Sequence, residues 1–173
     1  MQYLLELLKI LLPSVVVFLT AYYLINNFLE TQQKNKMLEL QLSNKQTILP
    51  VRLQAYERVL LLLERISPEN IVMRIRKPDM TAADLQVALV NEVRNEFDHN
   101  LSQQLYLSDD AWYMVKSAKE EVIRIINNAY GKMGENDKAN QMSKTIFNDL
   151  MNVQKHPTEP AIQRLKQEAQ QMF

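Results

Sequence analysis

The residues of this chain with the clearest capacity for chemistry lie in the stretch NEVRNEFDHN, residues 91–100. Glu96 and His99 are three positions apart, the Glu-x-x-His spacing that directs two metal ligands inward in di-iron carboxylate bundles. Such a centre also needs a second Glu-x-x-His element and two further carboxylates. The other histidine, His156, is followed by a proline and has no glutamate three positions before it. The pattern therefore supplies only half of such a metal centre.

The group Glu92, Glu96 and His99 consequently has two interpretations. The first is a metal–carboxylate enzyme to which Glu120 and Glu121 add carboxylates, although the second imidazole is lacking. The second, which we favour, is an ordinary solvated face of a helix, because charged faces are typical of bundle helices. We predict no catalytic residue, no metal ligand and no cofactor, and therefore a protein that is not an enzyme.

Other chemical signatures are weaker still. The chain has no cysteine, which excludes disulfides, zinc–thiolate sites and thiol catalysis. Its 2 glycines, Gly131 and Gly134, are too few for a phosphate-binding loop. Residues 78–173 contain ten Lys and Arg against fourteen Asp and Glu, whereas a nucleic-acid-binding domain usually has a strongly basic face. We predict that the protein does not bind nucleic acid.

The elements that would have to position these residues are helices. Few glycines disfavour tight hairpins, and the frequent Leu, Met, Gln, Glu and Lys residues are good helix formers. Apolar residues recur at helical spacing through residues 50–173. The expected inward-facing sets are Leu53, Tyr56, Leu60 and Leu63; Leu85, Leu89, Val93, Phe97, Leu101 and Leu105; Val115, Ala118, Val122, Ile125 and Ala129; Ala139, Met142, Ile146, Leu150 and Val153; and Ile162, Leu165, Ala169 and Met172.

Helix starts are also marked in the sequence. Thr81 with Asp84 resembles a capping box, and Ser108 precedes two aspartates that favour the positive end of a helix dipole. Ser67 before a proline and Thr158 are further candidate N-caps, and Pro50 fits a first turn or a bend. The sequence leaves open whether residues 70–76 form a helical turn or a strand.

The lone tryptophan, Trp112, also allows two interpretations. With Tyr113 and Met114 it could form an exposed aromatic docking patch. Because it falls in the first turn of an amphipathic helix, we favour a place in the core or at its edge.

A second feature of the chain is the run ILLPSVVVFLTAYYLINNFL, residues 10–29, with 20 consecutive uncharged residues. About 20 such residues are needed to cross the hydrocarbon layer as a helix. A cleavable signal peptide is disfavoured, because the run has no small-x-small cleavage site after it. A soluble core helix is disfavoured too, because this stretch has no polar face. We predict that residues 10–29 contact the lipid bilayer as a permanent transmembrane helix.

The expected organisation is all-α, with an N-terminal transmembrane helix that continues into a long helix and is followed by an antiparallel helical bundle. Residues 1–30 would be the anchor, 31–49 a juxtamembrane helical stalk and 50–173 a cytoplasmic bundle domain. Lys34, Lys36 and Lys45 follow the run, so the positive-inside rule places the N-terminus outside and the C-terminal part in the cytoplasm. The predicted location is the cell's inner membrane, with a single pass.

The segment 31–77 is basic, with nine Lys and Arg against four Asp and Glu. These cations could bind anionic lipid headgroups, and RIRKP, residues 74–78, is their densest part. We favour the ordinary explanation, a positive-inside signal combined with a salt-bridged helix surface, since the charges are spread out. Spacing typical of a coiled coil near Leu29 and Leu40 is weak.

The stretches LPVRLQAYERVLLLLERISPENIVMRI (50–75) and NEFDHNLSQQLYLS (95–108), together with the N-terminal span, resemble an uncharacterised family of short, single-span membrane proteins from Bacteroidota. The resemblance implies a bacterial inner-membrane location and a helical cytosolic part. It implies no activity and no functional residues.

Two functional classes follow. The first, which we favour, is a membrane-anchored, non-enzymatic interaction or scaffold protein that binds a protein partner or forms a homo-oligomer. The alternative is a stalk-type structural subunit of a larger membrane complex. The sequence does not identify the partner, the oligomeric state, any small-molecule ligand or the biological process.

Overall fold

The computed structural model describes the backbone of residues 2–152 and 156–172, and the side chains of these residues apart from 2–14 and 40–47. Within this part of the chain all regular elements are helical. They are α1 (Gln2–Ile66), α2 (Pro68–Ile75), α3 (Ala82–His99), the 3-10 helix η1 (Leu101–Leu105), α4 (Asp109–Tyr130), α5 (Ala139–Met151) and α6 (Glu159–Gln170). The all-α prediction is confirmed. The chain divides into two units, residues 1–48 and 49–173.

In the first unit, the large apolar side chains of α1 from Val15 to Leu29 are exposed. Each of them is between 48 and 68 % exposed. No helix has, within the residues whose side chains are described, an apolar stretch long enough to cross a membrane. The predicted span starts at Ile10, so its residues 10–14 lie outside the described side chains.

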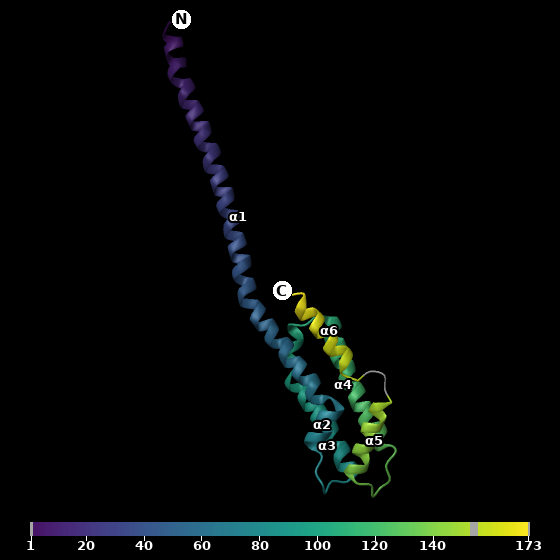
Figure 1. Cartoon of the computed structure of the whole chain (residues 1–173). Coiled ribbons are helices and arrows are strands. Elements are labelled where there is room, and N and C mark those ends of the chain that lie inside the picture. Colours follow the sequence, from purple (N-terminus) through teal and green to yellow (C-terminus); the bar gives the residue numbers. More distant parts are fainter. Residues whose placement is uncertain (1, 153–155, 173) are drawn as a thin grey trace. The chain divides into compact units, whose positions relative to one another are not determined.

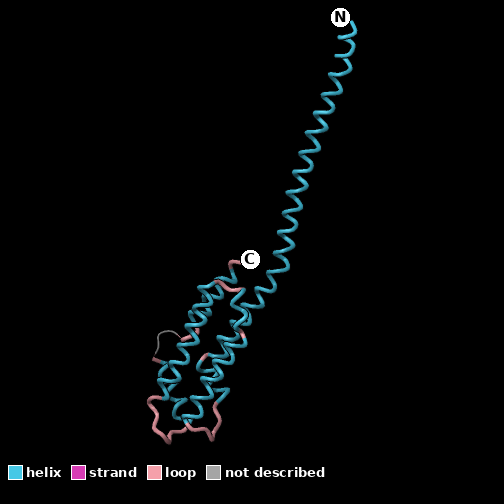
Figure 2. The backbone as a smooth tube through the Cα atoms, turned by 180° about the vertical axis from the view of Figure 1, so that it is seen from behind, coloured by secondary structure: helices cyan, strands magenta, loops and turns pink. Residues whose placement is uncertain are grey.

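The second unit is a helical bundle (Figures 1 and 2). It contains residues 49–66 of α1 together with α2 to α6. α3 and α4 run in opposite directions, since Gln86 bonds to Asn127 near one end of the pair and Phe97 stacks on Trp112 near the other. α4 and α6 are also antiparallel, because Arg164 in α6 lies beside Asp110 at the start of α4, and Ala161 and Ala118 line one hollow.

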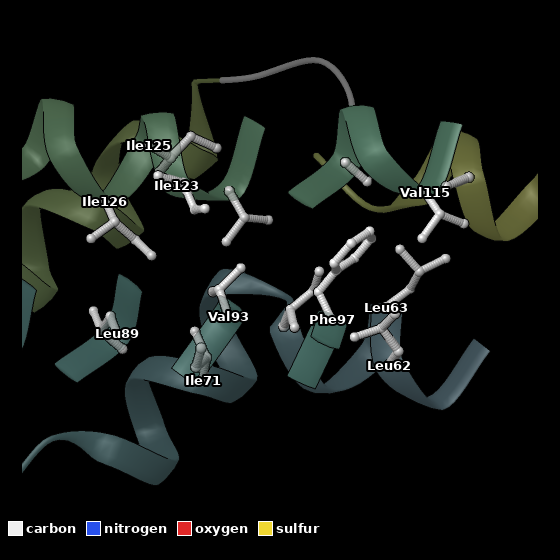
Figure 3. Packing of buried hydrophobic residues seen from close by; sticks show 14 of the residues in the cluster. Leu62, Leu63, Ile71, Leu89, Val93, Phe97, Val115, Ile123, Ile125 and Ile126 are labelled. Atoms are coloured by element: carbon white, nitrogen blue, oxygen red, sulfur yellow. The ribbon is translucent and has the colours of Figure 1, made fainter. Parts of the chain in front are cut away.

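The core of the bundle is formed by buried apolar residues from all six α-helices in the described part of the chain. Figure 3 shows part of this core. The predicted inward set of α4 is buried throughout. In α1 the buried face is Ala55, Tyr56, Val59, Leu62, Leu63 and Ile66. The predicted stripe there is therefore displaced: Tyr56 and Leu63 are buried, whereas Leu53 and Leu60 are only partly covered.

The predicted stripe of α3 is correct only to Phe97. Leu101 is 44 % and Leu105 is 80 % exposed. The reason is that α3 ends at His99 and the backbone tightens into η1 from Leu101 to Leu105, which changes the direction of the following side chains. For α5, Ala139, Met142, Ile146 and Leu150 are buried as expected, whereas Val153 lies outside the described residues.

Two of the predicted helix caps are formed. The Thr81 hydroxyl accepts a hydrogen bond from the Asp84 amide at 3.1 Å, and the Asp84 carboxylate accepts one from the Thr81 amide at 3.2 Å. Ser108 accepts from the Ala111 amide at 3.1 Å. These bonds satisfy amides that have no carbonyl partner in the first helical turn.

Other local predictions need correction. Ser67 and Thr158 occupy N-cap positions without a side-chain cap bond, and Ser67 donates instead to the carbonyl of Glu64. Pro50 does not start a helix, because α1 continues through it at the loss of one backbone hydrogen bond. The open question on residues 70–76 is answered by α2, which is helical to Ile75.

Candidate functional site

The carboxylates of the suspected metal site lie in an ion-pair network between α1, α2 and α3. Glu96 Oε1 is 2.5 Å from Arg65 Nη2 and 3.6 Å from Arg74 Nη2. Arg74 Nη2 is also 3.0 Å from Glu92 Oε1. Two guanidinium groups thus balance two carboxylates, and a cation placed there would have to displace both arginines.

The remaining residues of that hypothesis lie elsewhere. His99 Nδ1 is 2.8 Å from the carbonyl of Asn95 in its own helix. His156 Nδ1 is 3.0 Å from Glu69 Oε1, and Glu121 is paired with Arg124. No group of three or more His, Asp or Glu side chains in the described residues is arranged to hold a metal ion.

A buried polar cluster that the sequence did not indicate joins three helices of the bundle. Its centre is Glu168 in α6, which is only 9 % exposed. The Tyr56 hydroxyl of α1 donates to Glu168 Oε2 at 2.9 Å, and the Ser108 hydroxyl at the start of α4 donates to Oε1. Arg164 Nη2 lies 3.0 Å from the same Oε1. We call Tyr56, Ser108, Arg164 and Glu168 the Glu168 cluster.

The electrostatics of the Glu168 cluster favour a fixed ionic state. Burial alone would raise the pKa of Glu168, but the hydrogen bonds from Ser108 and Tyr56 and the charge of Arg164 outweigh it and lower the pKa. Burial is the main cause that raises the pKa of Tyr56, followed by the bond to Glu168 and its negative charge, with Arg52 opposing. At neutral pH the carboxylate is therefore ionised and the phenol protonated. The contacts of the carboxylate connect α6 to α1 and to the start of α4.

The sequence predicts only some members of this cluster. Tyr56 was predicted to be buried and Ser108 to cap a helix, and both predictions are confirmed. Glu168 gave no signal, since a charged residue on a surface helix is usually exposed. Its bond to Tyr56 joins residues 112 positions apart.

The aromatic residues of α4 occupy two environments. Trp112 is 7 % exposed and stacks on Phe97 with ring centroids 5.3 Å apart, which confirms its place at the core. The Lys119 ammonium lies 4.5 Å from the centre of the Phe97 ring. Tyr113 is 65 % exposed, and with Met114, Pro157 and Pro160 it lines a shallow hollow between α4 and α6.

The cations of the basic segment 31–77 that belong to the bundle have different surroundings. Arg65 and Arg74 lie within ion-pair distance of glutamates of α3. Arg76 and Lys77 instead line an open hollow together with Lys138. Lys45 lies outside the described side chains.

Comparison with known proteins gives one informative match. Residues 2–172 match the family described as "Family of unknown function (DUF7935)". The chain belongs to the DUF7935 family. No curated protein and no solved structure matches the chain significantly.

The resemblance to an uncharacterised family is thus confirmed. The DUF7935 match covers both units of the chain, residues 1–48 and 49–173. The matched range therefore includes the apolar stretch near the N-terminus as well as the bundle.

Proposed function

We propose that this DUF7935 protein is a membrane-anchored, non-enzymatic interaction or scaffold protein. Residues 10–29 span a bacterial inner membrane once, and the helical bundle binds a protein partner or a second copy of the chain in the cytoplasm. The proposed inner-membrane location rests on the resemblance to a family of Bacteroidota membrane proteins. The single observation that carries the proposal is the exposure of the apolar side chains from Val15 to Leu29 in α1.

Transfer of these exposed side chains into an apolar environment would be favourable. Val17, Phe18 and Tyr23 are each between 67 and 68 % exposed, and residues 10–29 contain no charge. Apolar side chains surround this helix, so a single neighbouring helix would cover only part of them, whereas lipid tails cover every face. The Thr20 hydroxyl donates to the carbonyl of Val16 at 2.8 Å, which satisfies this polar group within the helix, as a membrane requires.

The proposed orientation rests on positive charges beyond the run. Lys34, Lys36 and Lys45 lie within about 15–20 residues of its end, the range in which lysines and arginines oppose translocation. The bundle then lies in the cytoplasm and the N-terminus outside.

The interaction role is supported by apolar groups on the bundle surface. Leu105 is 80 % exposed, and it borders a hollow with Val51, Tyr106 and the cation Arg58. Exposed apolar side chains that lie together, with charges at their edge, are typical of protein-binding surfaces. We propose this surface as the place where the protein partner or the second copy binds.

The alternative is a stalk-type structural subunit of a larger membrane complex. It is favoured by residues 31–39, which are helical and exposed throughout. Residues 55–66 argue against a stalk that reaches to Ile66, since one face of this stretch belongs to the core of the bundle.

Membrane association is tested with the full chain by washing membranes in alkaline carbonate. The protein should stay in the membrane pellet, and a reporter fused to the C-terminus should be inaccessible from outside the cell. Release of most of the chain into the wash would refute the anchor. An accessible C-terminus would refute the orientation alone.

The interaction role is tested by purifying the tagged full chain in a mild detergent and measuring the mass of the complex. A second copy or one partner at fixed stoichiometry is expected. Leu105→Glu should abolish the association, whereas Leu61→Glu, at a position of the bundle that is 52 % exposed, should preserve it. A monomer in the unaltered protein would refute the role.

A further inference from the structure

One hollow of the bundle differs from the others in the charge of its lining. It measures about 440 Å³ and is lined by Arg76, Lys77, Pro78, Lys138 and Asn140. Three of these five residues are cationic, and no carboxylate belongs to the described lining. The hollow between α4 and α5 contains, by contrast, Glu121 and Asp149 as well as Arg124 and Lys132, so its charges balance.

The cationic hollow is built on two segments that are fixed to each other. The loop after α2 and the loop before α5 pair through an isolated β-bridge between Thr81 and Lys138. The Ala139 amide donates to the carbonyl of Met80 at 3.0 Å, and the Ala82 amide to that of Asp137 at 2.8 Å. These backbone bonds bring together cations that are about 60 positions apart in sequence.

A side-chain bond also shapes the hollow. Arg76 Nη1 donates to Asn140 Oδ1 at 2.8 Å. This contact occupies the acceptor atom of the Asn140 amide and leaves its NH₂ group as a donor beside the cations. The hollow therefore offers guanidinium, ammonium and amide donors, which are the groups that bind phosphate oxygens.

The cations of this hollow lack the neutralisation seen elsewhere in the bundle. Arg65, Arg74, Arg124 and Arg164 each lie within ion-pair distance of a carboxylate. Arg76, Lys77 and Lys138 have no such partner among the described residues. Among the carboxylates of the two loops and the helix starts beside them, those of Asp84 and Asp137 accept bonds from the backbone amides of Thr81 and Gly134. The carboxylate of Asp79, which follows Pro78 in the chain, forms no ion pair with the cations of the hollow in the described residues.

The position of Lys138 adds to this excess of positive charge. It occupies the N-cap of α5, where Ser, Thr, Asp and Asn are preferred and where the helix dipole disfavours a cation. A bound anion would relieve the repulsion among Lys138, Lys77 and Arg76.

From these observations we infer that the hollow of Arg76, Lys77, Lys138 and Asn140 binds a phosphate-bearing anion, and we call it the anion hollow. The phosphate group comes either from a soluble compound or from the headgroup of an anionic lipid. This site is independent of the apolar run 10–29 and of the surface around Leu105.

The test uses the isotope-labelled full chain in micelles of an uncharged maltoside detergent. Inorganic pyrophosphate and, separately, phosphatidylglycerol in the same micelles are titrated while the backbone amide signals are followed. The amides of Lys77, Lys138 and Asn140 should shift, and the shift should weaken as salt is added. A response to pyrophosphate assigns a soluble source, and a response to phosphatidylglycerol alone assigns a lipid headgroup.

Matched variants complete the test. The double change Lys77→Ala and Lys138→Ala should weaken binding by at least about tenfold, because it removes two charge-assisted contacts. Lys144→Ala with Lys166→Ala removes the same charge from exposed positions outside the hollow and should change affinity less than about twofold. No shift with either probe, or equal weakening in both double variants, would overturn the inference. Unchanged signals of core amides show that the variants remain folded.

Discussion

Helix α1 contains two apolar stretches that share residue types but differ in their surroundings. In residues 55–66 one face is buried, and Val59, Leu62 and Leu63 on this face are between 0 and 1 % exposed. In residues 15–29 apolar residues occur on all sides, and Leu19 and Leu24 are 57 and 60 % exposed. Content of Leu, Val and Ile alone therefore does not determine whether a stretch of this helix is buried.

The arrangement of polar residues does distinguish the two stretches. Glu57, Arg58 and Glu64 alternate with the apolar residues of the second stretch and give it a solvated face. The first stretch has no charge, so it lacks a face that water would solvate. The same helical backbone thus supports protein packing in one stretch and, in our proposal, lipid contact in the other.

The largest expected effect comes from charging the first stretch. Val17→Lys combined with Leu19→Lys should release the full chain from membranes into an alkaline carbonate wash. Each lysine near the middle of a span costs about 2.5–3.5 kcal/mol of insertion free energy. The fraction in the pellet measures the effect.

The control for this prediction is Met37→Lys with Leu38→Lys, which charges exposed apolar positions of α1 beyond the run. This variant should remain in the pellet. If both variants are retained, or both are released, the proposed contact of residues 10–29 with lipid is contradicted.

The next effect concerns the second stretch. Leu63→Ala should lower the free energy of unfolding of the bundle by about 2–5 kcal/mol, since it leaves a cavity at a fully buried position. Leu61→Ala, at a position 52 % exposed, should change it by less than about 0.5 kcal/mol. Chemical denaturation followed by circular dichroism measures both, and equal losses would contradict the assignment of the buried face.

Much of this fold could be predicted from the sequence because its signals are local. All five residues that spacing predicts to face inward in α4 are buried, and Thr81 with Asp84 marks the start of α3. The predictions were wrong where the surrounding structure overrides the preference of a single residue or of a spacing. Pro50 is tolerated inside α1, and the turn into η1 redirects Leu101 and Leu105 although their spacing continues the stripe.

The polar sites were less predictable, since their members are distant in sequence. The short spacing of Glu96 and His99 suggests a metal site. In the structure, however, Glu96 pairs with Arg65, which lies 31 positions earlier, and with Arg74. The Glu168 cluster and the anion hollow each join loops or helices that periodicity treats separately. Only packing of the whole bundle brings these residues together.

A smaller effect is expected in the Glu168 cluster, which is the polar counterpart of the buried apolar face of α1. Glu168→Gln should lower the free energy of unfolding by about 1–3 kcal/mol at neutral pH, because buried donors lose a charged acceptor. Glu120→Gln, with an acidic side chain that is 67 % exposed, should have little effect. Thermal unfolding of the full chain compares the two variants.

The pH dependence of the same variant follows from the lowered pKa of Glu168. The stability that its carboxylate contributes is present above the ordinary value of 4.5 and is lost as the pH falls through the lower pKa of the folded state. The difference in stability between the unaltered protein and Glu168→Gln should therefore shrink as the pH falls below 4.5. A difference that stays constant to low pH would show that the charge contributes nothing.

The smallest expected effect on stability comes from the N-cap of α3, and it is compared with the start of α2, which has no side-chain cap bond. Thr81→Ala removes the acceptor of the Asp84 amide and should cost about 1 kcal/mol of unfolding free energy, and Thr81→Ser should restore most of it. Ser67→Ala should cost less, because the Ser67 hydroxyl donates to the carbonyl of Glu64 and caps no amide of α2. Equal losses at both positions would mean that the cap bond of Thr81 adds nothing to the bundle. The Thr81→Ala variant should also be retained in the membrane as the unaltered protein is, since the bond between Thr81 and Asp84 lies wholly within residues 49–173.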